Sequence, residues 1–211
     1  MRKLMFGFVL STTAALLVAA PAAFAASGGG CELQGTASFA PGLNSEEKPF
    51  AYSFGGALSG CQSSEASAPK AGTVEAGKTL AEQVKNSITG ATDTVTYQEP
   101  AATGTGGCAR STTAGTALVT WADGTHTVIG YSTTGALAAV SLSGSVKESI
   151  TLSAVNPPAG DPATFTITTS RDAGDSSSGL LAFQPPEAAA CTTATGATTA
   201  AISGTVGLFG S

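Results

Sequence analysis

Two β-branched runs joined by Asp123-Gly124 constrain this chain more than any other feature, because they predict a β-hairpin over residues 112–134. Asp-Gly between alternating runs is a strong hairpin signal, since a type I′ turn needs positive φ at both central residues and both residue types tolerate it. A two-residue loop also sets the expected register, in which Ala122 faces Thr125. The hairpin carries the single Trp and the single His of the chain.

This register divides the large side chains of the hairpin between its two faces. We expect Trp121 to share one face with Val119 and Val128. The opposite face would then carry three side chains: Leu118, Ile129 and Tyr131. Because both faces are apolar, the hairpin should lie centrally in its sheet, with Trp121 in the core. In the alternative, Trp121 and Tyr131 lie on an exposed face together with Tyr52 and Tyr97 and stack on sugar rings. Trp121 and Tyr131 are therefore the candidate ligand-binding residues.

Residues 1–25 have the form of a secretory signal peptide. A basic start is followed by an apolar run over residues 4–20, and Ala23-Phe24-Ala25 is a small-x-small cleavage signal. We expect cleavage after Ala25, which leaves residues 26–211 as a single secreted domain. No later stretch reaches the roughly 18 uninterrupted apolar residues that a transmembrane helix requires.

The charge of the mature chain argues against nucleic-acid binding. Residues 26–211 carry seven Lys and Arg against 14 Asp and Glu, a net charge of −7, and the basic residues are scattered singly. Binding to nucleic acid requires clustered Lys and Arg that displace counterions. Only 11% of the chain is charged, and Ala, Thr, Ser and Gly are abundant. Such a surface suits an extracellular β-protein, with Thr at outward strand positions and Gly in turns.

The four cysteines predict two disulfides, because their number is even and the chain is exported. Their spacing of tens of residues does not fit a zinc site. Residues 33–39 and 50–58 resemble two strands around a loop, and the midpoint of Cys31 and Cys61 falls inside that loop. An antiparallel pair would therefore place these two cysteines opposite each other, which leaves Cys108 to bond Cys191. Each bridge should stabilise the fold by roughly 3 to 5 kcal/mol.

The remaining pattern describes an all-β chain with at most one short helix. Strands are expected at residues 71–76, 92–98, 137–147, 151–155, 165–167, 180–183 and 200–208, with loops at 99–107 and 172–179. Residues 77–90 fit a helix beginning near Thr79 or a strand over residues 84–89. About nine or ten short strands separated by turns predict a sandwich or a barrel. We favour an antiparallel β-sandwich, for which an immunoglobulin-like topology is one arrangement.

Four short motifs surround the cysteines and turns: Cys31-x3-Gly35-x-Ala37-x-Phe39, Tyr52-Ser53-Phe54 to Gly60-Cys61, Gly107-Cys108, and Trp121-x-Asp123-Gly124. These motifs resemble those of small secreted β-rich proteins of high-GC Gram-positive (actinobacterial) bacteria. The resemblance spans most of the mature chain and implies secretion and a β-rich fold, without an activity. In composition and size the chain is also similar to secreted immunoglobulin-like chromoprotein carriers of the neocarzinostatin type, although its cysteine spacing differs.

No set of residues indicates catalysis, and we expect no enzymatic activity, no metal and no cofactor. His126 is the sole candidate imidazole base, but no Gly-x-Ser-x-Gly elbow accompanies it. Glu46 and Glu47 are adjacent in a loop, where they do not present the geometry of a glycosidase pair. The Asp172 to Gly179 segment misses the ligand spacing of a calcium loop. Residues 104–107 lack the helix and Lys of a phosphate-binding loop.

The sequence therefore predicts a non-catalytic secreted or cell-surface-associated β-sandwich that binds a partner: cell wall, polysaccharide, another protein or a small apolar ligand. An alternative is a structural protein that assembles through sheet edges, with the strand over residues 202–209 pairing with another chain. A third hypothesis is a hydrolase whose carboxylates are gathered by the fold. Its candidates are Glu75, Glu82, Asp93, Asp161 and Asp172.

Overall fold

The computed structural model describes residues 28–210, which form thirteen strands and one short 3₁₀ helix. The expected signal peptide lies outside these described residues. In chain order the elements are β1 (Gly28–Leu43), β2 (Lys48–Ser63), β3 (Gly72–Ala76), β4 (Thr79–Lys85), β5 (Thr92–Gln98), β6 (Ala102–Gly106), β7 (Arg110–Trp121), β8 (His126–Ala136), β9 (Ala139–Lys147), β10 (Ser149–Ala154), β11 (Thr164–Thr168), β12 (Ser176–Gln184), η1 (Ala188–Thr192) and β13 (Ala197–Phe209).

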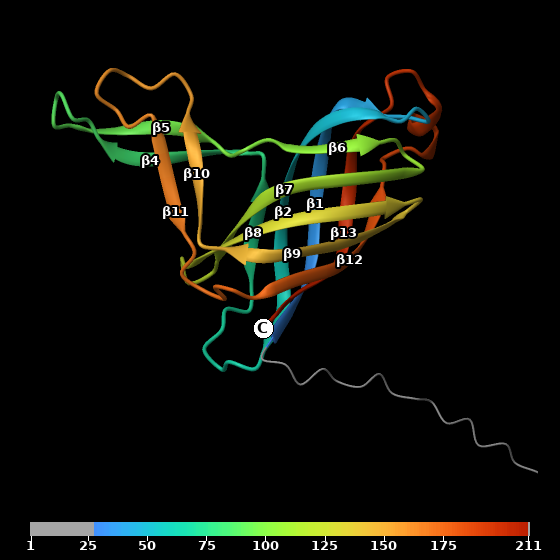
Figure 1. Ribbon diagram of the computed structural model, residues 1–211, viewed down its shortest axis with the longest axis horizontal. Helices are drawn as coiled ribbons and strands as arrows, with labels where there is room; N and C mark the ends of the chain where they lie inside the picture. The colour runs from blue at the N-terminus through green and yellow to red at the C-terminus, as the bar shows by residue number, and fades with distance from the viewer. Residues whose placement is uncertain (1–27, 211) are drawn as a thin grey trace, which may run out of the picture.

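Nine strands form one sheet that closes into a barrel (Figure 1). The order is β1-β13-β12-β9-β8-β7, after which β3 and β6 both pair β7 with β2, and β2 pairs with β1. All of these pairings are antiparallel. The expected all-β class and antiparallel pairing are confirmed. Because the sheet returns to its first strand, however, it forms a barrel and not the expected sandwich with its immunoglobulin-like arrangement.

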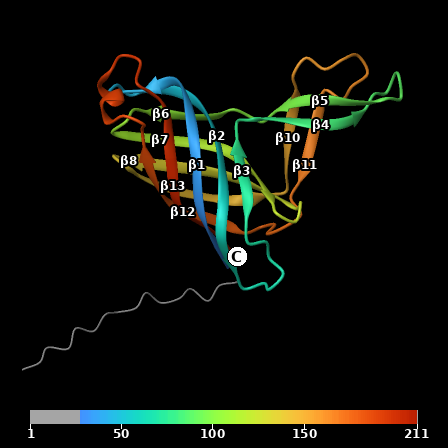
Figure 2. The ribbon, with the colours of Figure 1, turned by 180° about the vertical axis from the view of Figure 1, so that it is seen from behind.

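One strand position of the barrel wall, which we call the split stave, is occupied by two short strands, β3 and β6. β3 pairs with residues 54–58 of β2, and β6 pairs with residues 48–52 of the same strand, so β3 and β6 follow one another along the wall. At the break between them the chain leaves the barrel to form β4 and β5 and then returns. With β10 and β11, these strands make a second sheet of order β11-β10-β5-β4, which extends from one side of the barrel (Figure 2).

Two apolar clusters follow from this arrangement. The first fills part of the barrel interior and is built from inward-facing residues such as Leu33, Leu58 and Val119. The second lies between the barrel wall and the small sheet. There Leu118 and Val128, which face outward from β7 and β8, pack with the apolar side chains of the small sheet. The small sheet therefore covers the outer face of the central hairpin around Leu118 and Val128 and buries both residues almost completely.

The hairpin exists where expected, but its register differs by one residue. Thr120 lies opposite His126, and the amide of Trp121 donates to the carbonyl of Thr125 at 2.9 Å. The loop therefore has three residues and ends at Gly124, whose φ is +80°. A three-residue loop with a left-handed glycine is the next most common hairpin connection after the two-residue turn.

The one-residue shift changes which side chains share a face, as the period of two requires. Ile129 and Tyr131 point into the barrel with Trp121 and Val119, whereas Val128 points outward with Leu118. The expected division of the hairpin was therefore wrong for Val128, Ile129 and Tyr131. Trp121 itself is in the core, with 9% of its surface exposed.

Four other segments complete the comparison with the sequence. Residues 77–90 contain the strand β4, so the expected helix is absent, and the strand lies at Thr79–Lys85 instead of at residues 84–89. Residues 99–107, expected to form a loop, contain β6. The expected loop over residues 172–179 ends early, since β12 begins at Ser176. The strand expected over residues 202–209 is part of β13, whose two edges pair with β1 and β12, so it offers no free edge to another chain.

Both expected disulfides are confirmed. Cys31 bonds Cys61 and joins β1 to β2, close to the bulge that separates their two stretches of pairing. Cys108 bonds Cys191 and ties the turn before β7 to η1.

Candidate functional site

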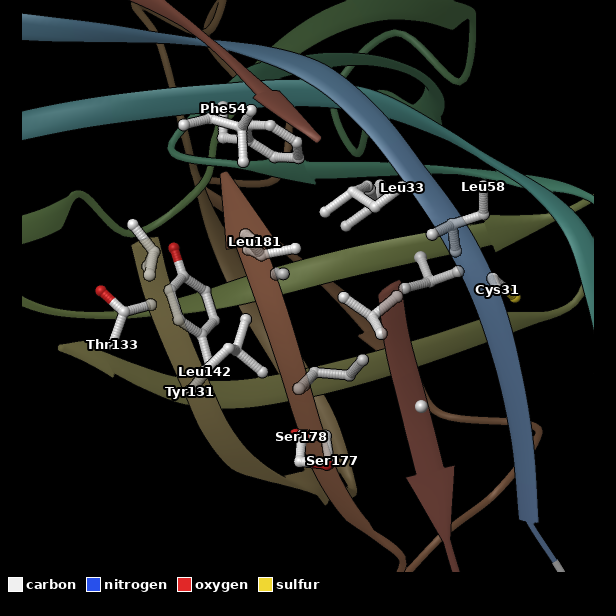
Figure 3. A pocket seen from close by; sticks show the side chains of 18 of the residues that line it. Cys31, Leu33, Phe54, Leu58, Tyr131, Thr133, Leu142, Ser177, Ser178 and Leu181 are labelled. Carbon is white, nitrogen blue, oxygen red and sulfur yellow. The ribbon is translucent and has the colours of Figure 1, made fainter. Parts of the chain in front are cut away.

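The interior of the barrel holds a cavity of about 370 Å³ (Figure 3). An eight-stranded barrel is just wide enough either to be filled by side chains or to hold one small ligand. Here inward positions occupied by Ala37, Ala76 and Ala117 leave the centre open. The apolar part of the wall comes from several staves and includes Leu33, Phe54, Leu58, Val119, Ile129, Leu142 and Leu181.

A chain of four hydroxyl groups interrupts the apolar wall on the side formed by β2, β7 and β8. The phenol oxygens of Tyr52 and Tyr131 lie 2.6 Å apart. The Tyr52 oxygen lies 3.1 Å from Oγ1 of Thr113, which in turn lies 2.7 Å from Oγ1 of Thr133. We call these four residues the hydroxyl chain. All four line the cavity, and Figure 3 shows the Tyr131 and Thr133 side chains at its edge.

The two phenols of the hydroxyl chain are protonated at neutral pH. Burial raises the pKa of Tyr131 above the usual tyrosine value, and the neighbouring Tyr52 raises it further. Burial also raises the pKa of Tyr52, although its hydrogen bonds to Thr113 and Tyr131 act in the opposite direction. The hydroxyl chain is therefore neutral and does not supply a base.

Gly115 makes room for the Tyr131 ring. It lies opposite Tyr131 in the pairing of β7 with β8. A Cβ at this position would lie 2.9 Å from the Tyr131 hydroxyl oxygen and 3.1 Å from its Cζ. A larger residue would push the phenol out of its position, so glycine is required here for close approach.

A further hydroxyl reaches the cavity from another wall. Ser177 of β12 is 5% exposed, lines the cavity, and its Oγ has no hydrogen-bond partner among the described residues. Ser177 lies opposite Gly144 of β9, which lies opposite Tyr131 of β8. The unpartnered Ser177 hydroxyl is therefore separated from the Tyr131 backbone by one strand (Figure 3).

Both candidate ligand-binding residues line this cavity. Trp121 lies in the wall, and its indole Nε1 donates a 2.9 Å hydrogen bond to Oγ1 of Thr127. Tyr131 belongs to the hydroxyl chain. Neither ring forms the exposed stacking surface that the sugar-binding alternative requires. The sequence interpretation missed Thr113 and Thr133, because the wrong hairpin register did not place the two threonines opposite each other. It named Tyr52 only as an exposed stacking ring, whereas Tyr52 lines the cavity.

The charged residues of the cavity wall lie at the ends of the barrel. Arg171 is bridged to Glu65 and to Asp123, with nitrogen to oxygen distances of 3.2 and 3.1 Å. Asp172 follows with a φ of +62°, and burial raises the pKa of its carboxyl, as does the neighbouring Asp175. At the start of β7, Arg110 pairs with Glu47.

The other residues considered for chemistry lie apart from the cavity. His126 contacts Thr120 through Nδ1 at 3.3 Å and does not line the cavity. Asp93 and Asp161 both accept hydrogen bonds from the side-chain amide of Asn86, which follows β4, at 3.2 and 2.7 Å. Among the five carboxylates of the hydrolase hypothesis, only Asp172 lines the cavity.

Two general features of the described residues complete the description of the site. Over residues 28–210, no three His, Cys, Asp or Glu side chains lie together as a group that could hold a metal ion. In the same part of the chain there is no helix with the length and apolar composition needed to cross a membrane.

Comparison with protein-family models, curated proteins and solved structures found no significant match to this chain.

Proposed function

We propose that this chain is a non-catalytic, exported binding protein that holds one small, largely apolar molecule inside the barrel. The observation that carries the proposal is the cavity of about 370 Å³ with its mainly apolar wall. Ligand sites in proteins have volumes of about 300–1,000 Å³ and combine apolar walls with a few placed polar groups. The barrel interior has both properties, since its wall is mainly apolar and carries the hydroxyl chain and the Ser177 hydroxyl.

The alternatives named from the sequence have less support. Binding of polysaccharide or cell wall by stacking would use exposed rings, but Trp121 and Tyr131 line the interior. Assembly through the C-terminal strand would use a free edge, but both edges of β13 are paired. A hydrolase would need two opposed carboxylates in a cleft, whereas the carboxylates of the cavity lie at its charged end.

Export is part of the proposal. The two disulfides support an oxidising compartment, because disulfides persist outside the cytosol and are rare within it. The signal-peptide pattern of residues 1–25 points to the same compartment.

The proposal is tested by titrating the chain from residue 26 onward with N-phenyl-1-naphthylamine, an uncharged dye that fluoresces in apolar surroundings. We expect saturable binding of one dye molecule per chain. Ala117→Phe places a ring in the cavity and should weaken binding by at least about tenfold, which corresponds to ~1.4 kcal/mol.

Ala114→Phe is the matched control, because Ala114 is exposed on the outer face of the same strand. It should leave the dye affinity unchanged. Thermal melting confirms that both variants fold, and Ala117→Leu replaces Ala117→Phe if the larger ring prevents folding. If the unmodified chain does not bind the dye, or if both alanine variants bind it equally, the interior is not the binding site.

A further inference from the structure

The number of protons in the hydroxyl chain leaves one donor without an acceptor. Four hydroxyl groups carry four protons, and the three contacts Thr133 to Thr113, Thr113 to Tyr52 and Tyr52 to Tyr131 use three of them. When donation runs in one direction along the hydroxyl chain, the fourth proton lies at one end, on the Tyr131 or the Thr133 hydroxyl. Neither end residue has another side-chain or backbone partner for its hydroxyl among the described residues.

The second polar group of the cavity has the same requirement. The Ser177 hydroxyl is buried and has no partner, so its proton also lacks an acceptor. A buried hydroxyl without a hydrogen-bond partner destabilises the folded state, because it has lost its hydration without replacement. A molecule with acceptor oxygens would pair both with the Ser177 hydroxyl and with the spare proton, and only an acceptor uses all four protons of the hydroxyl chain.

The charge of the interior limits the ligand further. The charged lining residues lie at the ends of the barrel, and the hydroxyl chain itself is neutral. A charged group placed beside Tyr131 would lose its hydration without gaining a counter-charge. The wall thus favours a neutral molecule over a carboxylate or an amine.

Resting on the proposed function, we infer that the barrel selects neutral, largely hydrocarbon carbonyl compounds, and that the Tyr131 hydroxyl donates the hydrogen bond to the carbonyl oxygen. In this arrangement Thr133 donates to Thr113, Thr113 to Tyr52, and Tyr52 to Tyr131. The ligand then sets the direction of donation along the hydroxyl chain. Gly115 leaves room for the Tyr131 phenol at the cavity wall.

The test uses two probes, 2-acetylnaphthalene and its hydrocarbon isostere 2-isopropenylnaphthalene. They differ only in that the carbonyl oxygen of the ketone is replaced by a methylene group. Affinities are measured by equilibrium dialysis for the unmodified chain, for Tyr131→Phe and for Tyr97→Phe. The ratio of ketone to hydrocarbon affinity is compared between variants, because the difference in hydration of the two probes is the same for each variant and cancels in that comparison. We expect Tyr131→Phe to lower this ratio by roughly three- to tenfold, the net value of one hydrogen bond.

Tyr97→Phe is the matched control, because Tyr97 is buried in the small-sheet cluster and donates to the carbonyl of Pro162. Its ratio should equal that of the unmodified chain. The infrared carbonyl band of the bound ketone gives an independent readout. It should be shifted to lower frequency than in a hydrocarbon solvent, and Tyr131→Phe should remove that shift.

The outcomes separate the two proposals. If neither probe binds, the proposed function fails and this inference fails with it. If both probes bind and Tyr131→Phe leaves their ratio and the infrared band unchanged, the binding function stands and the inference is wrong. If Tyr131→Phe does not fold, the band position of the ketone in the unmodified chain decides, since an unshifted band excludes a hydrogen bond.

Discussion

The indole nitrogen of Trp121 donates a 2.9 Å hydrogen bond to the hydroxyl oxygen of Thr127, and both residues are buried in the barrel. The Thr127 hydroxyl in turn donates to the carbonyl of Arg171 at 3.2 Å. The Thr127 hydroxyl therefore forms hydrogen bonds both within the central hairpin and to the segment that connects β11 with β12. This pair gives the hairpin a polar contact that only the observed register allows, because Thr127 faces inward in it.

Thr127→Val should destabilise the protein by about 1–3 kcal/mol, because it leaves the Trp121 N–H buried without an acceptor. Urea unfolding at pH 7 measures the change. Thr112→Val on the exposed outer face of β7 is the control and should change stability by less than about 0.5 kcal/mol. Equal losses in the two variants would contradict the role assigned to Thr127.

Gly124→Ala should destabilise the hairpin by about 1 kcal/mol, because φ at this position is +80° and L-residues other than Asn and Asp avoid that region. A Cβ at Gly124 has no neighbouring heavy atom within 4 Å, so the cost comes from the backbone alone. Gly124→Asn should therefore cost less than Gly124→Ala in the same urea measurement. The reverse order would mean that the loop has another conformation.

Glu99→Gln should stabilise the protein more at pH 7 than at pH 4. Glu99 is 1% exposed, its Oε2 accepts from the amide of Lys78 at 3.0 Å, and its Oε1 has no partner. Burial raises the pKa of this carboxyl, so the folded state binds the proton more tightly than the unfolded state. The stability of the unmodified chain thus falls as pH rises from the unfolded pKa through the raised folded pKa.

The amide of Glu99→Gln does not titrate, so the difference in unfolding free energy between variant and unmodified chain should grow over that pH range. Unfolding in urea at several pH values between 4 and 7 measures this difference. Glu148→Gln, at an exposed position, is the control and should give a smaller dependence on pH. A difference for Glu99→Gln that does not change with pH would show that the buried carboxyl does not titrate as expected.

The two disulfides should differ in what they stabilise. Chain entropy predicts about 3.7 kcal/mol for Cys31–Cys61, with 30 residues of separation, and about 4.6 kcal/mol for Cys108–Cys191, with 83. None of the residues of η1 is buried, so the Cys108–Cys191 disulfide is the main link that holds this helix to the barrel. Replacing Cys108 and Cys191 by Ser should therefore speed amide exchange in η1, whereas the same change at Cys31 and Cys61 should not.

Global unfolding in urea measures the total loss for each pair of serine variants. Exchange followed by mass spectrometry measures the local effect in η1. Unchanged exchange in η1 after loss of Cys108–Cys191 would contradict the assignment, because other contacts would then hold the helix.

The sequence by itself determined features that depend on neighbours along the chain. Asp123-Gly124 located the hairpin, and the alternation of Val140, Ser141 and Leu142 located β9, because turn chemistry and a period of two are local properties. The pairing of Cys31 with Cys61 also followed, since two antiparallel strands around one short loop place their ends together.

Only the tertiary structure decided the closure of the sheet, the faces of the hairpin and the cavity. An inward and outward alternation is the same in a sandwich and in a barrel, so closure depends on pairings such as β1 with β2 and β6 with β7. One extra loop residue moved Ile129 and Tyr131 inward, because every side chain changes face when the register slips by one.

The hydroxyl chain joins residues that are 79 positions apart in the sequence, Tyr52 and Tyr131. No local pattern links them, and their contact exists because β2 and β8 are separated only by β7 and the split stave in the closed wall. Local sequence patterns and the cysteine positions thus specified an all-β protein with two disulfides. The position of each polar group in the interior came from long-range strand pairing.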